Sequence, residues 1–196
     1  MTREDHHALL RGAIPTPGGT WADLGSGTGT FTAALAESLG ADAVIYSVDI
    51  DAGALREQEW ELHARFPGIH LHTLQGDFNQ PLSLPALDGI LMANSLHFQE
   101  DPCASLSRAA GLLVPGGWLI IVEYDVQKAS PWVPYPVPWT RLPEVAACAG
   151  LTGTRLIDMR PSRYHGRVYS AVSQIAVQAP GGQAPGGQAP RSAMGR

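Results

Sequence analysis

A glycine-rich turn, Asp23-Leu24-Gly25-Ser26-Gly27-Thr28-Gly29, lies between a short apolar segment that starts at Thr20 and a run with helical periodicity. Glycines at such a turn let the backbone bend sharply and approach a ligand closely. In an open parallel sheet, ligands bind in the crevice beyond the carboxyl ends of the strands. The turn therefore predicts a ligand site in an α/β domain, and the alternative is a tight strand-to-helix turn without a ligand.

Strand and helix patterns alternate along the chain on both sides of this turn. The apolar periodicity predicts strands at 20–24, 43–48, 69–74, 88–93, 118–124, 154–159 and 168–177, and helices at 3–11, 28–40, 52–66, 101–114 and 142–149. Strands separated by helices require right-handed crossovers and a mostly parallel sheet. The last two strands are close enough in sequence to pair antiparallel.

Composition indicates one folded domain with a polar tail. The chain has 196 residues, of which 44% are hydrophobic, so it is too apolar to be disordered throughout. From residue 178 onward the pattern Ala-Pro-Gly-Gly-Gln repeats. Such a segment buries almost no apolar surface. We expect a domain at 1–177 and a disordered low-complexity tail at 178–196.

No apolar run resembles a signal peptide or approaches the roughly 18 residues of a membrane span, so we expect a cytoplasmic protein that does not enter a membrane. The two cysteines, Cys103 and Cys148, lie far apart and outside any C-x-x-C spacing. This spacing indicates neither a disulfide framework nor a zinc site, and we expect two small buried apolar residues. No metal site is predicted.

Polar residues follow each of three further predicted strands. Asp49 ends the second strand, 20 residues after Gly29, where a carboxylate can accept hydrogen bonds from both hydroxyls of a ribose. Asp77 follows the third strand and can recognise an adenine edge, or else form an Asx turn. Asn94 ends the fourth. Because parallel strands share one carboxyl edge, these residues favour a ligand that contains adenosine.

The spacing within the turn separates the possible cofactors. A dinucleotide fingerprint that starts at Gly25 needs its third glycine at position 30, which is Thr30. A P-loop is excluded because the chain has no Gly-Lys-Ser or Gly-Lys-Thr, and Lys128 is the only lysine. An adenosine ligand without phosphates fits better, and an NAD(P)-dependent oxidoreductase is the alternative.

The sequence resembles a class I S-adenosylmethionine-dependent methyltransferase of the small, stand-alone bacterial type. The resemblance covers roughly residues 18 to 177, and its motifs occur in the expected order: DLGSGTGTF at 23–31, VDI at 48–50, GDF at 76–78, LDGILMANSLHF at 87–98 and LLVPGGWLIIVEY at 112–124. It implies a Rossmann-like, seven-stranded, mostly parallel sheet with helices on both faces and the last strand antiparallel.

The resemblance also implies how S-adenosylmethionine binds as cofactor. The loop residues Gly25, Ser26, Gly27 and Gly29 would pass along its methionine half, and Asp23 would brace the loop. Asp49 would hold the ribose and Ile50 would pack on the adenine. Asp77 and Phe78 would contact the adenine amine and ring edge, and the backbone of Asn94 would lie near the methionine amino group.

Three residues are candidates for catalysis. A base helps when the methyl acceptor carries a proton, and His97 lies just beyond the fourth strand, beside the predicted cofactor. Its alternative is to start a helix and pack or cap locally. Glu123 and Tyr124, at the end of the fifth strand, are second candidates, with a buried polar contact as their alternative.

The acceptor is expected to be a small molecule. Enzymes of this fold that methylate amino groups of nucleobases typically carry Asn/Asp-Pro-Pro-Tyr/Phe after the fourth strand, whereas this chain has Asn94-Ser95-Leu96-His97. The loop at 131–139 offers three aromatic residues either to an apolar pocket or to the core. The arginines Arg155, Arg160, Arg163 and Arg167, near Tyr164, suggest RNA only as a minor alternative, because the net charge is −5. A non-catalytic module that binds S-adenosylmethionine remains a further alternative.

Overall fold

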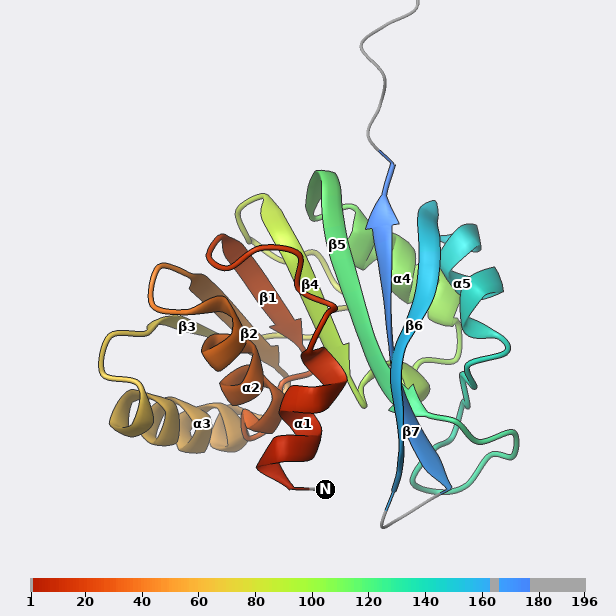
Figure 1. Cartoon of the computed structure of the whole chain (residues 1–196), viewed down its shortest axis with the longest axis horizontal. Helices are drawn as coiled ribbons and strands as arrows, with labels where there is room; N and C mark the ends of the chain where they lie inside the picture. Colours follow the sequence, from red (N-terminus) through yellow and green to blue (C-terminus); the bar gives the residue numbers. More distant parts are fainter. Residues whose placement is uncertain (1, 163–165, 177–196) are drawn as a thin grey trace, which may run out of the picture.

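A seven-stranded sheet forms the centre of the structure, which is a computed structural model that describes residues 2–162 and 166–176 (Figure 1). The strand order is β3-β2-β1-β4-β5-β7-β6. Strand β7 runs opposite to the other six strands, so the pairs β5–β7 and β7–β6 are antiparallel and the remaining pairs are parallel. The strands are β1 (Thr20–Leu24), β2 (Val44–Asp49), β3 (His70–Gln75), β4 (Leu87–Ala93), β5 (Leu113–Tyr124), β6 (Leu151–Pro161) and β7 (Arg167–Ile175).

Helices cover both faces of this sheet because successive strand residues point to opposite sides. Trp21 belongs to one core and the adjacent Ala22 to the other. The first core lies under α1 (Arg3–Leu10), α2 (Thr30–Leu39) and α3 (Ala52–Arg65). The second lies under α4 (Pro102–Ala110) and α5 (Leu142–Cys148). The predicted Rossmann-like fold, with helices on both faces and the last strand antiparallel, is confirmed (Figure 1).

The largest difference from the predicted boundaries concerns α4 and β5. The helix predicted at 101–114 ends at Ala110, and β5 already begins at Leu113. Between the pairs Leu87–Leu113 and Gly89–Trp118 the β4–β5 register shifts, so that residues 114–117 bulge out of the ladder. The Pro-Gly-Gly segment therefore interrupts a strand rather than ending a helix.

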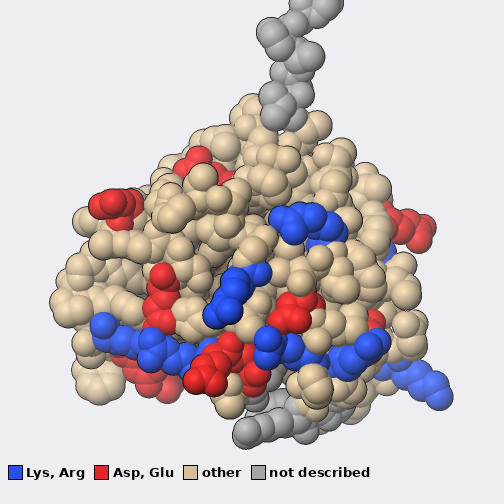
Figure 2. All heavy atoms as spheres, in the orientation of Figure 1, with Lys and Arg blue, Asp and Glu red and all other residues tan. Residues whose placement is uncertain are grey.

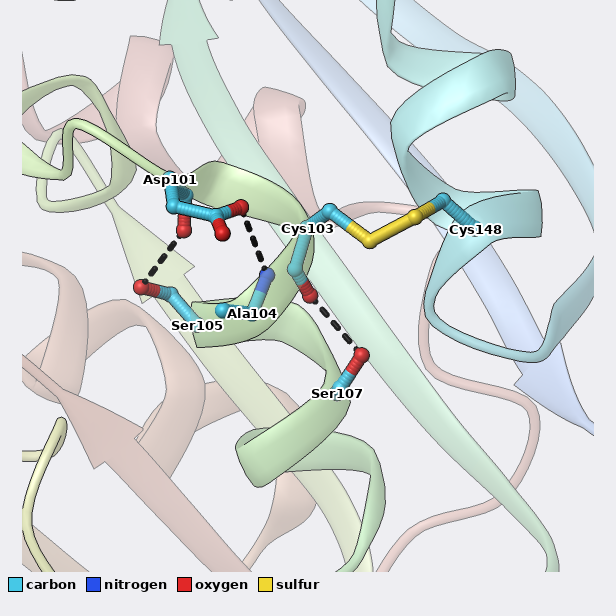
Figure 3. The surroundings of a disulfide bond; sticks show 6 residues. All are labelled: Asp101, Cys103, Ala104, Ser105, Ser107 and Cys148. Carbon is cyan, nitrogen blue, oxygen red and sulfur yellow. Dashed lines mark hydrogen bonds between the residues drawn. A yellow bond between two sulfur atoms is a disulfide. The ribbon is translucent and has the colours of Figure 1, made fainter.

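The prediction for the cysteines is wrong. Cys103 and Cys148 form a disulfide that joins the start of α4 to the end of α5, with the two Cα atoms 5.9 Å apart (Figure 3). Cys103 is half-buried and Cys148 is exposed, so neither is a core residue. Their 45-residue separation carries no disulfide signal. They meet only because α4 and α5 pack side by side on one face of the sheet.

The topology brings the polar strand ends together. The parallel strands β1 to β5 all present their carboxyl ends at one edge, and the strand order reverses between β1 and β4. Within the described part of the chain, no helix is long and apolar enough to cross a membrane. The repeat tail at 178–196 lies outside the described residues.

Candidate functional site

The glycine turn forms a loop between β1 and α2 that bends over the end of β2. Gly25, Gly27 and Gly29 all have positive φ, which L-residues other than glycine rarely adopt. The backbone N–H groups of Gly25 and Ser26 donate to the carbonyl of Val48, at 2.8 and 3.1 Å. The loop is thus tied to β2, and its inner surface is backbone.

A buried polar network supports the loop from below. Gln58 of α3 is fully buried, accepts a 3.2 Å hydrogen bond from the Ser26 hydroxyl, and donates to the hydroxyls of Thr32 and Ser47. Thr32 in turn donates to the carboxylate of Asp23 at 2.7 Å. Sequence reasoning missed Gln58, because one glutamine in a polar helix gives no signal of burial.

Asp23 is the buried acid of the site. Its Oδ1 has no hydrogen-bond partner within the described part of the chain, and its Oδ2 accepts the bond from Thr32. Burial raises the pKa of Asp23 to about 7, the hydrogen bond from Thr32 opposes this rise, and the nearby Asp49 adds to it. A positively charged ligand beside Asp23 would favour its ionised form.

Asp49 and Ile50 end β2 beside the loop. The Asp49 carboxylate accepts 2.7 and 2.9 Å hydrogen bonds from the N–H groups of Gly27 and Asp51. A carboxylate has further lone pairs, so these bonds orient Asp49 while it can still accept from hydroxyls. The neighbouring Ile50 side chain is 70% exposed, which is unusual for isoleucine and leaves an apolar surface at the sheet edge.

Asp77 and Phe78 lie beyond β3. The Oδ1 atom of Asp77 accepts a 2.8 Å hydrogen bond from the N–H of Asn79, which is the Asx turn considered above. Phe78 is half-buried against the core under α4 and α5. One carboxylate oxygen of Asp77 is therefore used by its own turn, and the other is left for a ligand.

The end of β4 is strained and pinned to the glycine loop. Asn94 has φ +53°, and it is the one non-glycine residue with positive φ in the described ranges. Its buried Oδ1 has no hydrogen-bond partner among the residues described. The next residue, Ser95, donates a 2.7 Å hydrogen bond to the Leu24 carbonyl, which joins β4 to the start of the loop.

The three predicted catalytic residues lie together. His97, in the short 3-10 helix η1 (Leu96–Phe98), is 2% exposed, and its Nδ1 is 2.7 Å from Oε2 of Glu123. Glu123 also accepts hydrogen bonds from the backbone N–H groups of Leu96, His97 and Tyr124. The Tyr124 ring centroid is 5.7 Å from that of His97. Together, these contacts attach η1 to the end of β5.

A cavity of about 400 Å³ opens at this edge of the sheet. Its wall contains residues 25–28 of the glycine loop, Asp23, Asn94 and Tyr124, and it also contains His6 of α1. Among the residues described, His97 and Glu123 do not line it. His6, which sequence reasoning missed, enters the site because α1 packs across α2 and β6.

Residues 22–119 match the methyltransferase domain family. The chain belongs to this family. Uncharacterized methyltransferases of Mycobacterium tuberculosis and Mycobacterium bovis are 32% identical to it over 120 residues, which are 61% of this chain and 57% of each relative. This methyltransferase domain thus matches little more than half the length of those relatives.

Solved structures agree with the fold of the methyltransferase. A SAM-dependent methyltransferase from Aquifex aeolicus superposes with a TM-score of 0.69 at 19% identity, over 88% of this chain and 90% of that one. The 1,6-didemethyltoxoflavin N1-methyltransferase of Burkholderia thailandensis, solved with S-adenosylhomocysteine, gives 0.69 at 17% identity, over 89% and 78%. The resemblance to class I methyltransferases is confirmed, and S-adenosylmethionine is the cofactor it implies.

The residues present fit that cofactor. Two buried oxygens, Oδ1 of Asp23 and Oδ1 of Asn94, lack partners within the described part of the chain and lie on residues of the cavity wall, where an ammonium or hydroxyl group would satisfy them. A Cβ at Gly27 would meet no atom within 4 Å, so the loop surface there is open. The exposed side chain of Ile50 offers an apolar face for the adenine ring.

The aromatic side chains of the loop at 131–139 lie in different environments. Trp132 is 73% exposed, whereas Trp139 packs against Tyr169 with centroids 6.0 Å apart. The Tyr135 N–H donates to the His97 carbonyl at 2.9 Å, which fastens the loop to η1. Among the residues described, none of these aromatics lines the cavity of about 400 Å³.

The late arginines mostly contact their own chain. Arg155 donates to the Gly12 carbonyl, Arg160 pairs with Asp5 and Asp158, and Arg167 pairs with Asp125. Figure 2 shows basic side chains interspersed with acidic ones on one face of the molecule, not a continuous basic patch. Arg163 and Tyr164 lie outside the described residues.

Proposed function

We propose that this chain transfers the methyl group of S-adenosylmethionine to a nucleophilic atom of a small-molecule acceptor. The observation that carries the proposal is the cavity at the sheet edge. It combines the glycine loop with the buried Asp23 and the half-buried Asn94, each of which has a buried oxygen without a hydrogen-bond partner among the described residues. A volume of about 400 Å³ lies within the range of pockets that hold small-molecule ligands.

Each site residue has a proposed role in binding. The loop residues Gly25, Ser26, Gly27 and Gly29 bound the methionine half, supported by Asp23. Asp49 receives the ribose hydroxyls while the Gly27 and Asp51 amides hold its orientation. Ile50, Asp77 and Phe78 surround the adenine, and Asn94 faces the methionine amino group.

When bound, S-adenosylmethionine supplies an electrophilic methyl group on a sulfonium that leaves as a neutral thioether. The chain contributes position and exclusion of water, because in-line displacement requires the acceptor atom about 3 Å from the methyl carbon and aligned with the breaking bond. Tyr124 lies on the cavity wall, where it would contact a bound acceptor. His97 and Glu123 hold Tyr124 and η1 in place, which is a positioning role.

Isothermal titration with S-adenosylhomocysteine tests the cofactor assignment. We expect Asp49→Ala to weaken binding at least about tenfold, since hydrogen bonds to a charged group contribute about 1.5–3 kcal/mol. The matched control is Asp42→Ala, which removes an exposed carboxylate just before the start of β2 at Val44. Binding that is equal in both variants, or absent in the wild type, would refute the assignment.

A methyl-labelling assay tests the reaction itself. The intact chain is incubated with radiolabelled S-adenosylmethionine and a small-molecule extract of the source cell, and the labelled product is identified. Label in a low-mass compound supports the proposal. Tight binding of S-adenosylhomocysteine without any transfer would favour a non-catalytic binding module, and thermal protection by NADH alone would favour an oxidoreductase.

The cytoplasmic location is also a proposal, and the disulfide bears on it. Disulfides persist mainly in oxidising compartments. Thiol trapping of the protein in intact cells tests the point: Cys103 and Cys148 trapped as thiols support a cytoplasmic location, and a disulfide formed before lysis opposes it.

A further inference from the structure

Two cavities meet at His6. The cavity of about 400 Å³ and a second one of about 240 Å³ share His6, Thr28 and Thr30 on their walls. The second cavity lies between α1, the start of α2, and α3. The His6 ring packs on Phe31, with centroids 4.7 Å apart. The imidazole is thus a half-buried part of the wall that the two cavities share.

The helix that carries His6 is anchored on both sides of it. Asp5 closes the capping box at the start of α1 and pairs with Arg160 of β6 at 3.3 Å. His7 pairs with Glu37 of α2. Further along, Leu9 and Leu10 are fully buried. A side chain on so fixed a segment keeps its place in the cavity, as a catalytic group requires.

The chemistry of His6 differs from that of His97. The Nδ1 atom of His97 is used by Glu123, and its ring lies behind the wall. His6 has no salt bridge in the described part of the chain, and it is the one histidine on the wall of the larger cavity among the residues described. A neutral imidazole carries a free lone pair that can accept a proton.

Other titratable groups lie next to His6 on α1 or on the walls of the same two cavities. Asp5 and His7 flank it on α1, Asp23 and Tyr124 share the larger cavity, and Glu61 and Arg65 share the smaller one. Burial is the main cause that lowers the pKa of His6, with the charge of the amino terminus next. Asp5 raises this pKa and His7 lowers it. A lowered pKa keeps the imidazole neutral near pH 7.

We propose that His6 is the general base of the methyl transfer, a catalytic residue for an acceptor with an O–H or N–H group. This inference rests on the proposed function. As the acceptor lone pair forms its bond to the methyl carbon, the electron pair of the breaking carbon–sulfur bond stays on sulfur. The acceptor proton passes to an imidazole nitrogen of His6 and from there to water.

Nuclear magnetic resonance on the full chain with labelled histidine tests the location without any acceptor. S-adenosylmethionine carries a positive sulfonium, whereas S-adenosylhomocysteine has a neutral sulfur at the same atom. If His6 lies beside the reacting atoms, its measured pKa is lower by about 0.5 or more in the S-adenosylmethionine complex than in the S-adenosylhomocysteine complex. His63, exposed at the end of α3, is the internal control and stays unchanged. Equal His6 pKa values in the two complexes would overturn the proposal.

Kinetics with the acceptor found in the labelling assay test the role. We expect His6→Asn to lower the rate at saturating cofactor by about 10²–10⁴, with the affinity for S-adenosylhomocysteine changed less than about twofold. His6→Gln provides a second variant, and His63→Asn is the control. A normal rate in the His6 variants, or a loss of rate that merely follows weakened cofactor binding, would refute the base role. Failure of the proposed function is distinct, because the wild-type chain would then either bind no S-adenosylhomocysteine or transfer no methyl group to any acceptor, whereas failure of the base role alone leaves wild-type transfer intact.

Discussion

Replacing Asp23 by asparagine should stabilise the ligand-free chain and weaken the cofactor complex at the same time. Asp23 is fully buried, one of its oxygens lacks a partner within the described residues, and its pKa is raised from 3.8 to about 7. Asparagine has nearly the same shape and can still accept the hydrogen bond from Thr32. It removes the ionisable group and little else.

The sign and size of the stability change follow from the linkage between proton binding and folding. Because the unfolded state ionises near 3.8 and the folded state near 7, wild-type stability falls as pH rises through this interval and then levels off. Integration between pH 5 and 8 gives a loss of about 2.5 kcal/mol at 1.36 kcal/mol per pKa unit. The free energy of unfolding of Asp23→Asn relative to wild type should therefore rise by that amount over the same range.

Urea denaturation of both proteins at pH 5, 6.5 and 8, without ligand, measures this difference. Other titrating groups cancel in the subtraction, provided that the substitution leaves their pKa values unchanged. A difference that does not vary with pH would refute the reasoning, because Asp23 would then titrate alike in the folded and unfolded states.

The affinity for the cofactor should show the opposite dependence on pH. The positive charges of S-adenosylmethionine favour ionised Asp23, so wild-type affinity should increase about tenfold from pH 6 to 8 as a group with a pKa of about 7 ionises. Asp23→Asn should bind more weakly and lose this pH dependence, as measured by isothermal titration. An equally steep pH dependence in the variant would assign the effect to another group.

Two further predictions concern stability. Gly29→Ala would place a Cβ 2.3 Å from Cγ of buried Gln58 at φ +82°, so we expect urea denaturation to show about 2–4 kcal/mol of destabilisation. Gly27→Ala has open space around its Cβ, so it should lose only about 1 kcal/mol of stability and mainly weaken S-adenosylhomocysteine binding. Equal stability losses in the two variants would contradict the packing argument. Cys148→Ser opens a disulfide across 45 residues and should lower stability by about 2–4 kcal/mol under oxidising conditions but not in dithiothreitol, and the same loss in both conditions would mean that the bond does not form.

Much of the architecture follows from local sequence. Apolar periodicity places all seven strands, and the boundaries of β1 are predicted to the residue. The segment before Trp118 was not predicted, because Pro-Gly-Gly usually ends a helix, and only pairing with β4 extends β5 back to Leu113. Local patterns therefore identify the elements, and pairing between distant segments sets where they end.

The site divides in the same way. Sequence spacing by itself identifies the glycine loop, Asp49 and the polar ends of β3 and β4, because backbone conformation and strand direction are enough to bring them to one edge. Tertiary structure alone decides that Gln58 supports the loop and that Glu123 holds His97 behind the cavity wall. It also decides that His6 reaches the cavity and that Cys103 meets Cys148. Each of these contacts joins residues on elements far apart in the chain, and their meeting depends on how helices pack on the sheet, which no local pattern records.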